Sequence, residues 1–243
     1  MATVHDRYPL PNLVDLSNNL AGCRYFTKID LVKGYHQVPM AAADIAKTAI
    51  ITPFGLFEYV FMPFGLKNAA QTFQRLMDRL FRHLPFLFSY IDDHLVASRT
   101  MEEHMEHLEQ VFKVLEENGL RINPAKCVFA ATSVEFLGHS VSSAGVVPLP
   151  KHVAAVAAFP QPGDVKALQR FLGVVNFYRR FIPGAAGILR PLTDALRGET
   201  KRLVWTAPMA AAFSAAKAAL ASAAPPGASF RLSCSLPRRG CLR

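Results

Sequence analysis

The chain has 243 residues, and 51% of them are hydrophobic, which is enough for one large or two modest buried cores and excludes a disordered protein. Its 27 Lys and Arg against 18 Asp and Glu give a net charge of +9, which favours a polyanionic partner. Its apolar runs are too short to cross a bilayer and its start lacks an apolar signal core, so we expect no membrane segment and an intracellular location.

The first part of the chain predicts short strands and turns. A short helix is expected over residues 13–20, followed by a strand over residues 25–30 that ends in the acid Asp30. Residues 47–52 and 56–62 flank the turn sequence Pro53-Phe54-Gly55 and therefore predict a β-hairpin.

Two amphipathic helices are predicted, each opened by a capping sequence. The first begins at Asn68 with Gln71 completing the capping box, and the second runs from Thr100 to Gly119. Helical spacing predicts their buried faces, Phe73, Leu76, Met77, Leu80 and Leu84 in the first and Leu108, Val111, Phe112 and Leu115 in the second, with Arg75, Arg79 and Arg82 outward. The second helix also carries His104 and His107 at a spacing that suits a metal, but without an evident third ligand, so we expect surface histidines.

Two adjacent acids, Asp92 and Asp93, lie between short apolar runs in residues 88–97. The flanking runs predict strands, which places the acids at the tight turn of a hairpin. Like charges on a half-buried element repel unless a cation neutralises them, so a divalent metal site is one interpretation and a polar hairpin tip is the other.

A third acid makes the metal interpretation more specific. If the strand that ends at Asp30 neighbours this hairpin, the three carboxylates converge and can hold two divalent ions, an arrangement suited to phosphoryl transfer. Successive strand residues face opposite sides, so we expect Asp30 and Asp92 to bridge the ions and Asp93 to bind one of them.

The second half of the chain changes from mixed strand and helix to helix. Residues 126–129 and 134–141 predict a further hairpin, Asp164 can cap a helix through Phe177, and an Ala-rich helix is expected over residues 209–223. The last ten residues have no periodicity and predict a frayed end. Basic residues interleaved with Phe177 and Tyr178 suit a grip on a phosphate backbone, and an ordinary basic helix bundle is the alternative; they are Lys166, Arg170, Arg179, Arg180, Arg190 and Arg197.

Six ordered blocks resemble the reverse transcriptases of gypsy-like LTR retrotransposons. The blocks are residues 26–31 with 34–37, 47–49, 62–69, 90–93, 135–138, and 168–173 with 176–183. The resemblance implies an α+β right-hand polymerase fold with an antiparallel palm sheet. It implies partial fingers and palm over residues 1–143, a helical thumb over 144–200, and a truncated connection segment with an aberrant tail over 201–243.

The resemblance also implies the site and its ligands. Asp30, Asp92 and Asp93 would be catalytic and would hold two Mg²⁺ or Mn²⁺ ions, with the backbone carbonyl of Leu31 as a further ligand. The residues implied to bind the nucleotide are Tyr35, Phe64, Gly65 and Lys47, and Tyr35 would close off the sugar 2′ position. The implied primer grip consists of Phe136, Leu137, Gly138 and His139. The residues implied to contact the nucleic-acid backbone are Lys166, Arg170, Arg179 and Arg180. The implied partners are an RNA template, a DNA primer and a dNTP.

The sequence departs from the family pattern in three places. It starts too late to contain the first part of the fingers, Ala70 stands where Pro is usual, and the acid expected of a ribonuclease H domain does not follow residues 230–233. We therefore expect the RNA-directed DNA polymerase of a retrotransposon polyprotein, a two-metal nucleotidyltransferase. The alternatives are a truncated remnant that only binds nucleic acid and a ribonuclease H.

Overall fold

The computed structural model describes residues 3–12, 16, 20–197 and 203–222. Contacts divide the chain into two compact units, residues 1–146 and 147–243. Apart from residues 16 and 20, the helix predicted over residues 13–20 lies outside the described residues, and so does the predicted frayed end.

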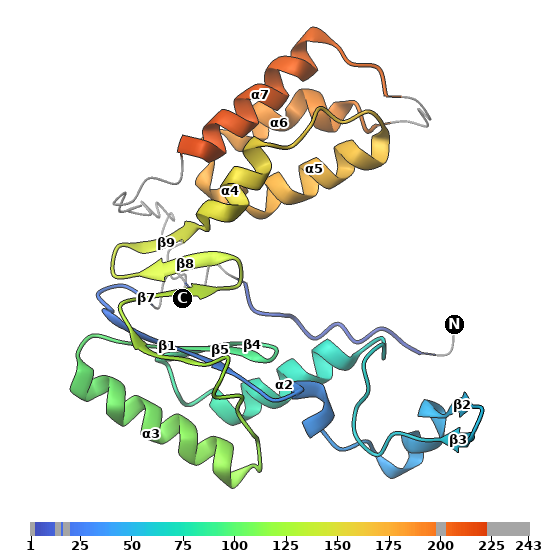
Figure 1. Cartoon of the computed structure of the whole chain (residues 1–243), viewed down its shortest axis with the longest axis vertical. Helices are drawn as coiled ribbons and strands as arrows, with labels where there is room; N and C mark the ends of the chain where they lie inside the picture. Colours follow the sequence, from blue (N-terminus) through green and yellow to red (C-terminus); the bar gives the residue numbers. More distant parts are fainter. Residues whose placement is uncertain (1–2, 13–15, 17–19, 198–202, 223–243) are drawn as a thin grey trace, which may run out of the picture. The chain divides into compact units, whose positions relative to one another are not determined.

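The first unit is built on a four-stranded antiparallel sheet in the order β4-β5-β1-β6 (Figure 1). Its strands are β1 (Tyr25–Asp30), β4 (Leu87–Tyr90), β5 (Asp93–Ser98) and β6 (Val128–Ala131), and its two long helices are α2 (Ala69–Phe81) and α3 (Met101–Glu117). β1 pairs with β5 along its whole length and ends with Asp30 directly opposite Asp93. Pairing therefore brings two of the predicted acids together, as the sequence predicts.

The two faces of this sheet belong to different cores. Ile29 and Val96 pack in one core with Phe73 of α2 and Val111 of α3, and Figure 1 shows both helices on one side of the sheet. The neighbouring strand residues, among them Phe26, pack on the other face with the hairpin of β7 (Ser133–Phe136) and β8 (His139–Ser142). Because residues two apart share a face, Asp30 lies on the β7–β8 side with Phe26.

The predicted capping bond forms at the start of helix α3 but not at the start of helix α2. Thr100 caps α3 by accepting a hydrogen bond from the Glu103 amide at 3.2 Å. Asn68 occupies the N-cap position of α2 as predicted, but its side chain makes no capping bond, because it accepts from the Asp6 amide and donates to the Val4 carbonyl instead. The predicted capping box with Gln71 does not form either, and the Gln71 Oε1 atom is buried without a hydrogen-bond partner.

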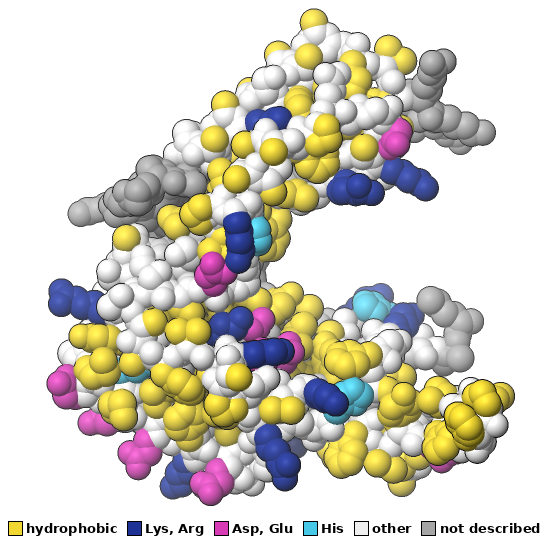
Figure 2. All heavy atoms as spheres, viewed as in Figure 1, with side chains coloured by type: hydrophobic (Ala, Val, Ile, Leu, Met, Phe, Trp, Pro, Cys, Tyr) yellow, Lys and Arg dark blue, Asp and Glu magenta, His cyan; other side chains and the backbone are white. Residues whose placement is uncertain are grey.

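Two further hairpins differ in how they match the sequence, one lying where it is predicted and one having a different pairing. β2 (Ile50–Thr52) pairs with β3 (Gly55–Phe57) as expected, although residues 47 and 48 belong to the 3-10 helix η2 (Ala42–Thr48) rather than to a strand. The predicted pairing of residues 126–129 with 134–141 is wrong. β6 joins β1, and β7 pairs with β8 through the turn Leu137-Gly138, whose φ values are both positive. Figure 2 shows hydrophobic side chains gathered over β2–β3, where Ile51 is 90% exposed, which is typical of an interaction surface.

The prediction of surface histidines on α3 is wrong for His104. Its ring is fully buried and lies within hydrogen-bonding distance of Thr27 Oγ1 and Ser98 Oγ, both at 2.7 Å. His107 is partly buried and stacks on the Phe86 ring at 3.5 Å between centroids. Both histidines therefore connect α3 to the sheet.

The second unit is helical, as predicted. Its elements, with the strand that crosses the boundary and pairs with β8, are β9 (Gly145–Pro148), α4 (Pro150–Ala157), α5 (Val165–Phe177), η3 (Arg179–Phe181), α6 (Ala185–Asp194) and α7 (Ala207–Ser222). Asp164 caps α5 by accepting from the Ala167 amide at 2.7 Å, and the Phe171 ring of α5 lies 4.6 Å from the Phe213 ring of α7. Among the helices that the structure describes, none combines the length and the apolar character needed to cross a membrane.

Candidate active site

The predicted acid pair lies at a two-residue turn. β4 ends at Tyr90 and β5 begins at Asp93, so Ile91 and Asp92 form the turn. The hairpin is present as the sequence predicts, but its turn lies one residue earlier than the predicted Asp92-Asp93, and Asp93 is the first residue of β5. Ile91 has a φ of +54°, a conformation that a β-branched residue adopts only under constraint and at a cost of about 1–3 kcal/mol. Surrounding contacts must therefore hold the segment that carries the acids.

A buried glutamine supplies such contacts. Gln74 of α2 is fully buried, accepts a hydrogen bond from the Ile91 amide at 2.7 Å and donates to the Ser89 carbonyl at 3.1 Å. The sequence reasoning missed it. The available signal is its place in α2 directly beside the apolar stripe, where a polar side chain needs buried partners.

Burial and neighbouring like charge both act on Asp92. Burial raises the pKa of Asp92, and the neighbouring carboxylates Asp93 and Asp30 raise it further, while Lys126 acts in the opposite direction. Asp93 pairs with Lys28 at 3.0 Å, and the Lys126 ammonium lies 3.8 Å from Asp30 Oδ1. Among the described residues, Asp92 forms no ion pair, so the site has an excess of negative charge that a cation would relieve.

The chemistry of these donors fits a divalent cation. They are carboxylate oxygens, which Mg²⁺ and Mn²⁺ prefer, and Asp30 Oδ1 is buried without a hydrogen-bond partner. Within the part of the chain that the structure describes, however, no group of three or more His, Cys, Asp or Glu side chains is arranged so that it could hold a metal. Mg²⁺ is usually held by one or two carboxylates together with substrate phosphates, so an open set of this kind suits it.

The backbone around Asp30 is fixed by a neighbouring segment. The Asp30 carbonyl accepts a hydrogen bond from the Asn123 amide at 2.8 Å, and the Asp30 amide donates to the Cys127 sulfur at 3.4 Å. Leu31 forms an antiparallel bridge with Ile122, and its side chain is buried in the helix-side core. These contacts hold the strand end that presents the Asp30 carboxylate.

An aromatic cluster lies next to Asp92. The Tyr35 ring meets the rings of Phe64 and Phe73 edge to face at 5.4 and 5.3 Å. Burial raises the pKa of the Tyr35 hydroxyl, and the Asp92 charge raises it further, which places this ring in the electrostatic range of the acid. Gly34 lies between Asp92 and Phe73, because a Cβ added to Gly34 would be 3.0 Å from Asp92 Cβ and 3.1 Å from Phe73 Cζ.

The remaining predicted nucleotide-binding residues lie in the segments on either side of β2–β3. Phe64 is 66% exposed, and Gly65 has a φ of +89° in the loop before α2. Lys47 pairs with Asp44 on the exposed surface of η2 rather than with any of the three acids. The structure thus brings Tyr35 and Phe64 together and leaves Lys47 apart from them.

The residues of the predicted primer grip form the β7–β8 turn. Phe136 pairs with His139 across the turn Leu137-Gly138, and the Phe136 ring meets Phe88 edge to face at 6.1 Å. His139 is fully buried, and its Nδ1 lies 2.8 Å from the Leu137 carbonyl. This hairpin covers the sheet face on which Asp30 lies.

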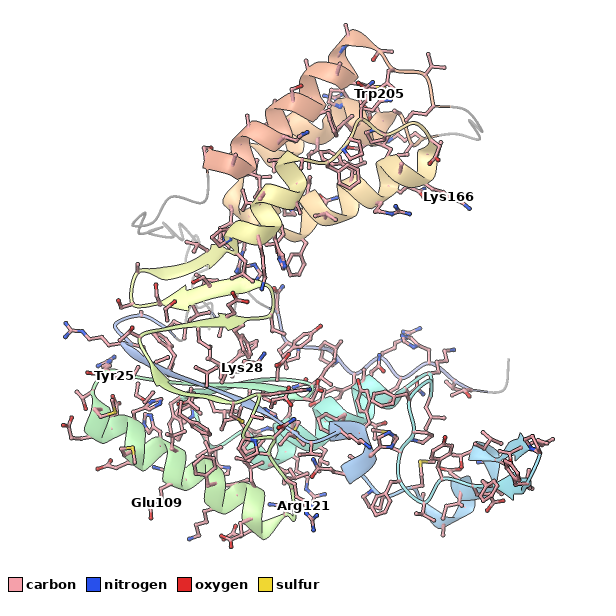
Figure 3. The ribbon with its side chains drawn as sticks, viewed as in Figure 1. Tyr25, Lys28, Glu109, Arg121, Lys166 and Trp205 are labelled. Atoms are coloured by element: carbon pink, nitrogen blue, oxygen red, sulfur yellow. The ribbon has the colours of Figure 1, made fainter. Side chains whose placement is uncertain are left out.

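The predicted backbone-binding residues lie in the second unit. Lys166 and Arg170, one helical turn apart, are exposed on α5, and Figure 3 shows Lys166 pointing away from the helix. Arg179 is exposed, whereas Arg180 is partly buried with its guanidinium 4.6 Å from the Phe181 ring centre. Tyr178 is buried, and its hydroxyl lies within hydrogen-bonding distance of His152 Nδ1.

Comparisons with known proteins identify the family of this chain. The family described as "Reverse transcriptase (RNA-dependent DNA polymerase)" matches residues 1–141. The chain belongs to the reverse transcriptase family. Among its relatives are two Drosophila melanogaster proteins, the retrovirus-related Pol polyproteins from transposon 297, 41% identical over 201 residues, and from transposon gypsy, 38% identical over 199 residues. This reverse transcriptase chain aligns over 82% and 81% of its length but spans about a fifth of theirs, 19% in each case.

Solved structures support the fold of this reverse transcriptase chain. A foamy viral protease-reverse transcriptase in complex with double-stranded DNA matches with a TM-score of 0.83 and 25% identity, over 90% of this chain and 39% of that one. The same viral enzyme with an RNA/DNA hybrid matches with a TM-score of 0.78 and 26% identity, over 89% of this chain and 30% of that one. The predicted α+β right-hand polymerase fold is therefore confirmed.

Proposed function

We propose that the chain is the RNA-directed DNA polymerase domain of a retrotransposon polyprotein and adds dNTPs to the 3′ end of a DNA primer on an RNA template inside the cell. The observation that supports the proposal is the strand pairing that sets Asp30 opposite Asp93, with Asp92 directly before Asp93 and within the electrostatic range of both acids and of Tyr35. The matched foamy viral structures are complexes with double-stranded DNA and with an RNA/DNA hybrid, which supports the choice of partners.

Asp30, Asp92 and Asp93, together with the Leu31 carbonyl, would hold two Mg²⁺ or Mn²⁺ ions. When bound, such ions lower the pKa of an attacking hydroxyl and stabilise the leaving oxygen. Lys28, 3.0 Å from Asp93, offsets part of the negative charge and limits the repulsion among the acids.

The surrounding residues would orient the substrates. The Tyr35 ring, fixed by Phe73, would meet a 2′-hydroxyl and so exclude ribonucleotides, while Phe64, Gly65 and Lys47 would contact the incoming nucleotide. Residues 136–139 would support the primer 3′ end. Lys166, Arg170, Arg179 and Arg180 would contact the duplex backbone, which provides affinity without sequence recognition.

Primer extension on an RNA template with Mg²⁺ tests the proposal. Asp92→Asn should reduce incorporation about 10³-fold or more, because several kcal/mol of charge stabilisation depend on this carboxylate. Asp194→Asn is the matched control, since Asp194 lies on α6 and pairs with Arg190 and Arg197. Unchanged extension by Asp92→Asn would contradict the assignment. Salt-sensitive duplex binding without incorporation by the unmodified chain would support the alternative of a remnant that only binds nucleic acid.

A further inference from the structure

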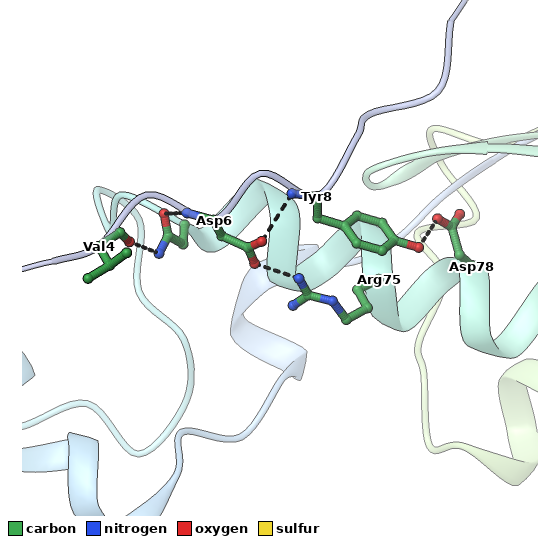
Figure 4. A network of polar contacts seen from close by, with 6 residues as sticks. Val4, Asp6, Tyr8, Arg75 and Asp78 are labelled. Atoms are coloured by element: carbon green, nitrogen blue, oxygen red, sulfur yellow. Dashed lines mark hydrogen bonds and ion pairs between the residues drawn. The ribbon is translucent and has the colours of Figure 1, made fainter.

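Residues 3–12 form an extended segment that is tied to α2 by a series of polar contacts (Figure 4). Asn68 bonds to the backbone of Val4 and Asp6, and Arg75 pairs with the Asp6 carboxylate at 2.6 Å. We refer to residues 3–12 as the N-terminal strap. Its position on α2 is fixed by side chains of that helix.

The contacts continue from the strap into the interior. The Tyr8 hydroxyl donates to Asp78 Oδ2 at 2.6 Å, and the other oxygen of Asp78 accepts from Gln74 Nε2 at 2.8 Å. Gln74 Oε1 accepts from the Ile91 amide at 2.7 Å. Three consecutive hydrogen bonds therefore lead from Tyr8 to the turn that carries Asp92.

Each bond in this line constrains the next. The two oxygens of Asp78 accept from different partners, so Tyr8 orients the carboxylate that Gln74 meets. The same carboxylate fixes which end of the Gln74 amide faces Ile91, because only the NH₂ end can donate to Asp78 and to the Ser89 carbonyl. The oxygen end is thereby left for the Ile91 amide, whose positive φ requires an external constraint.

We propose that Tyr8, Asp78 and Gln74 are positioning residues, which hold the Ile91-Asp92 turn in its strained conformation, so that docking of the strap on α2 determines where the Asp92 carboxylate lies. The effect on catalysis rests on the proposed polymerase function. The coupling between Tyr8 and the Ile91 amide does not.

Amide hydrogen exchange of the full chain labelled with ¹⁵N-isoleucine tests the coupling without any activity. Tyr8→Phe removes one hydroxyl, and we expect exchange at the Ile91 amide to rise about fivefold, the effect of weakening one hydrogen bond. Gln74→Met should raise it by more, because the acceptor itself is lost. The matched control is Tyr25→Phe, since Tyr25 lies on β1 away from the strap and no hydrogen bond from its hydroxyl is seen among the described residues.

The outcomes separate the two proposals. Unchanged Ile91 exchange in folded Tyr8→Phe protein would overturn the coupling, and so would an equal rise in Tyr25→Phe. If the chain extends primers, Tyr8→Phe should lower kcat about fivefold with the dNTP KM unchanged, because Tyr8 bonds to Asp78 of α2 and not to a residue of the predicted nucleotide site. A raised KM at constant kcat would contradict positioning of the acid. If the unmodified chain extends no primer, only the polymerase proposal fails, because the exchange result does not depend on it.

Discussion

Gly34→Ala should displace the Asp92 carboxylate, and the structure indicates by how much. The added methyl carbon would lie 3.0 Å from Asp92 Cβ and 3.1 Å from Phe73 Cζ. Because non-bonded carbons prefer separations of about 3.5–4.0 Å, one neighbour must move by roughly 0.5–1 Å. Phe73 is fully buried in the helix-side core, whereas Asp92 lies exposed at a turn, so we expect Asp92 to move.

The expected magnitudes follow from which neighbour moves. A displacement of the acid by nearly 1 Å should reduce kcat in primer extension about 10²-fold, while the free energy of unfolding falls by less than about 1 kcal/mol because a turn can adjust. If Phe73 moved instead, overpacking of the core would cost about 1–3 kcal/mol and leave kcat nearly unchanged. Measuring both quantities on the same samples separates the two results.

Two further variants test the steric argument. Phe73→Leu in the Gly34→Ala background removes part of the ring that confines the methyl group, so it should restore part of kcat. Gly187→Ala is the matched control, since Gly187 lies within α6 with no atom within 4 Å of the added Cβ, and it should stabilise the protein by about 0.5–1 kcal/mol. If Gly34→Ala protein has a normal kcat and is less stable by about 1–3 kcal/mol, the claim that Asp92 moves rather than Phe73 is refuted.

Three other results are expected. Tyr35→Val should raise the incorporation of ribonucleotides relative to deoxynucleotides by about tenfold or more, measured as a ratio of kcat/KM values, because the ring that would meet a 2′-hydroxyl is removed; an unchanged ratio would exclude Tyr35 as the discriminating residue. Lys166→Ala and Arg170→Ala should each lower the slope of log affinity for duplex against log salt by about 1, equally for different sequences, and a sequence-dependent loss would argue against backbone contacts. Burial lowers the pKa of His104, so its contribution to stability is complete above its ordinary pKa of about 6.5 and is lost as the pH falls through the lower folded value; urea unfolding of His104→Gln should show a weaker loss of stability below pH 6.5 than the unmodified chain, and equal pH profiles would contradict this.

The acids could be placed from the sequence because three independent patterns agree on them. β-propensity on both sides predicts a hairpin turn at the acids, the run before Asp30 predicts a strand end, and the resemblance implies one antiparallel palm sheet. Each pattern is local, so the residues alone left the pairing of β1 with β5 as a condition, which the structure fulfils.

Features that depend on tertiary contacts could not be predicted from the sequence. The sequence indicates an ordinary helix residue for Gln74 and a helix cap for Asn68, since their partners Ile91 and Val4 lie 17 and 64 residues away. The hairpin after residue 126 was assigned to the wrong strands because β6 and β7 are equally strand-like and only the positive φ of Leu137 and Gly138 marks the turn. His104 is buried because Thr27 and Ser98 offer it partners, which composition does not reveal.

The register of β5 explains why the acids occupy the end of the sheet. Asp93 faces the β7–β8 side and reaches Lys28, whereas the next residue, His94, faces the helices against the Phe81 ring. Burial lowers the pKa of His94 to about 4, so at neutral pH it brings no charge into that core. A slip of one residue would exchange these faces and bury the Asp93 carboxylate without a cation, at a cost of several kcal/mol. The bond from Gln74 to Ile91 opposes such a slip because it fixes the turn from the helix side, so the same contact that holds a strained residue also keeps the carboxylates on the face where Lys28 lies.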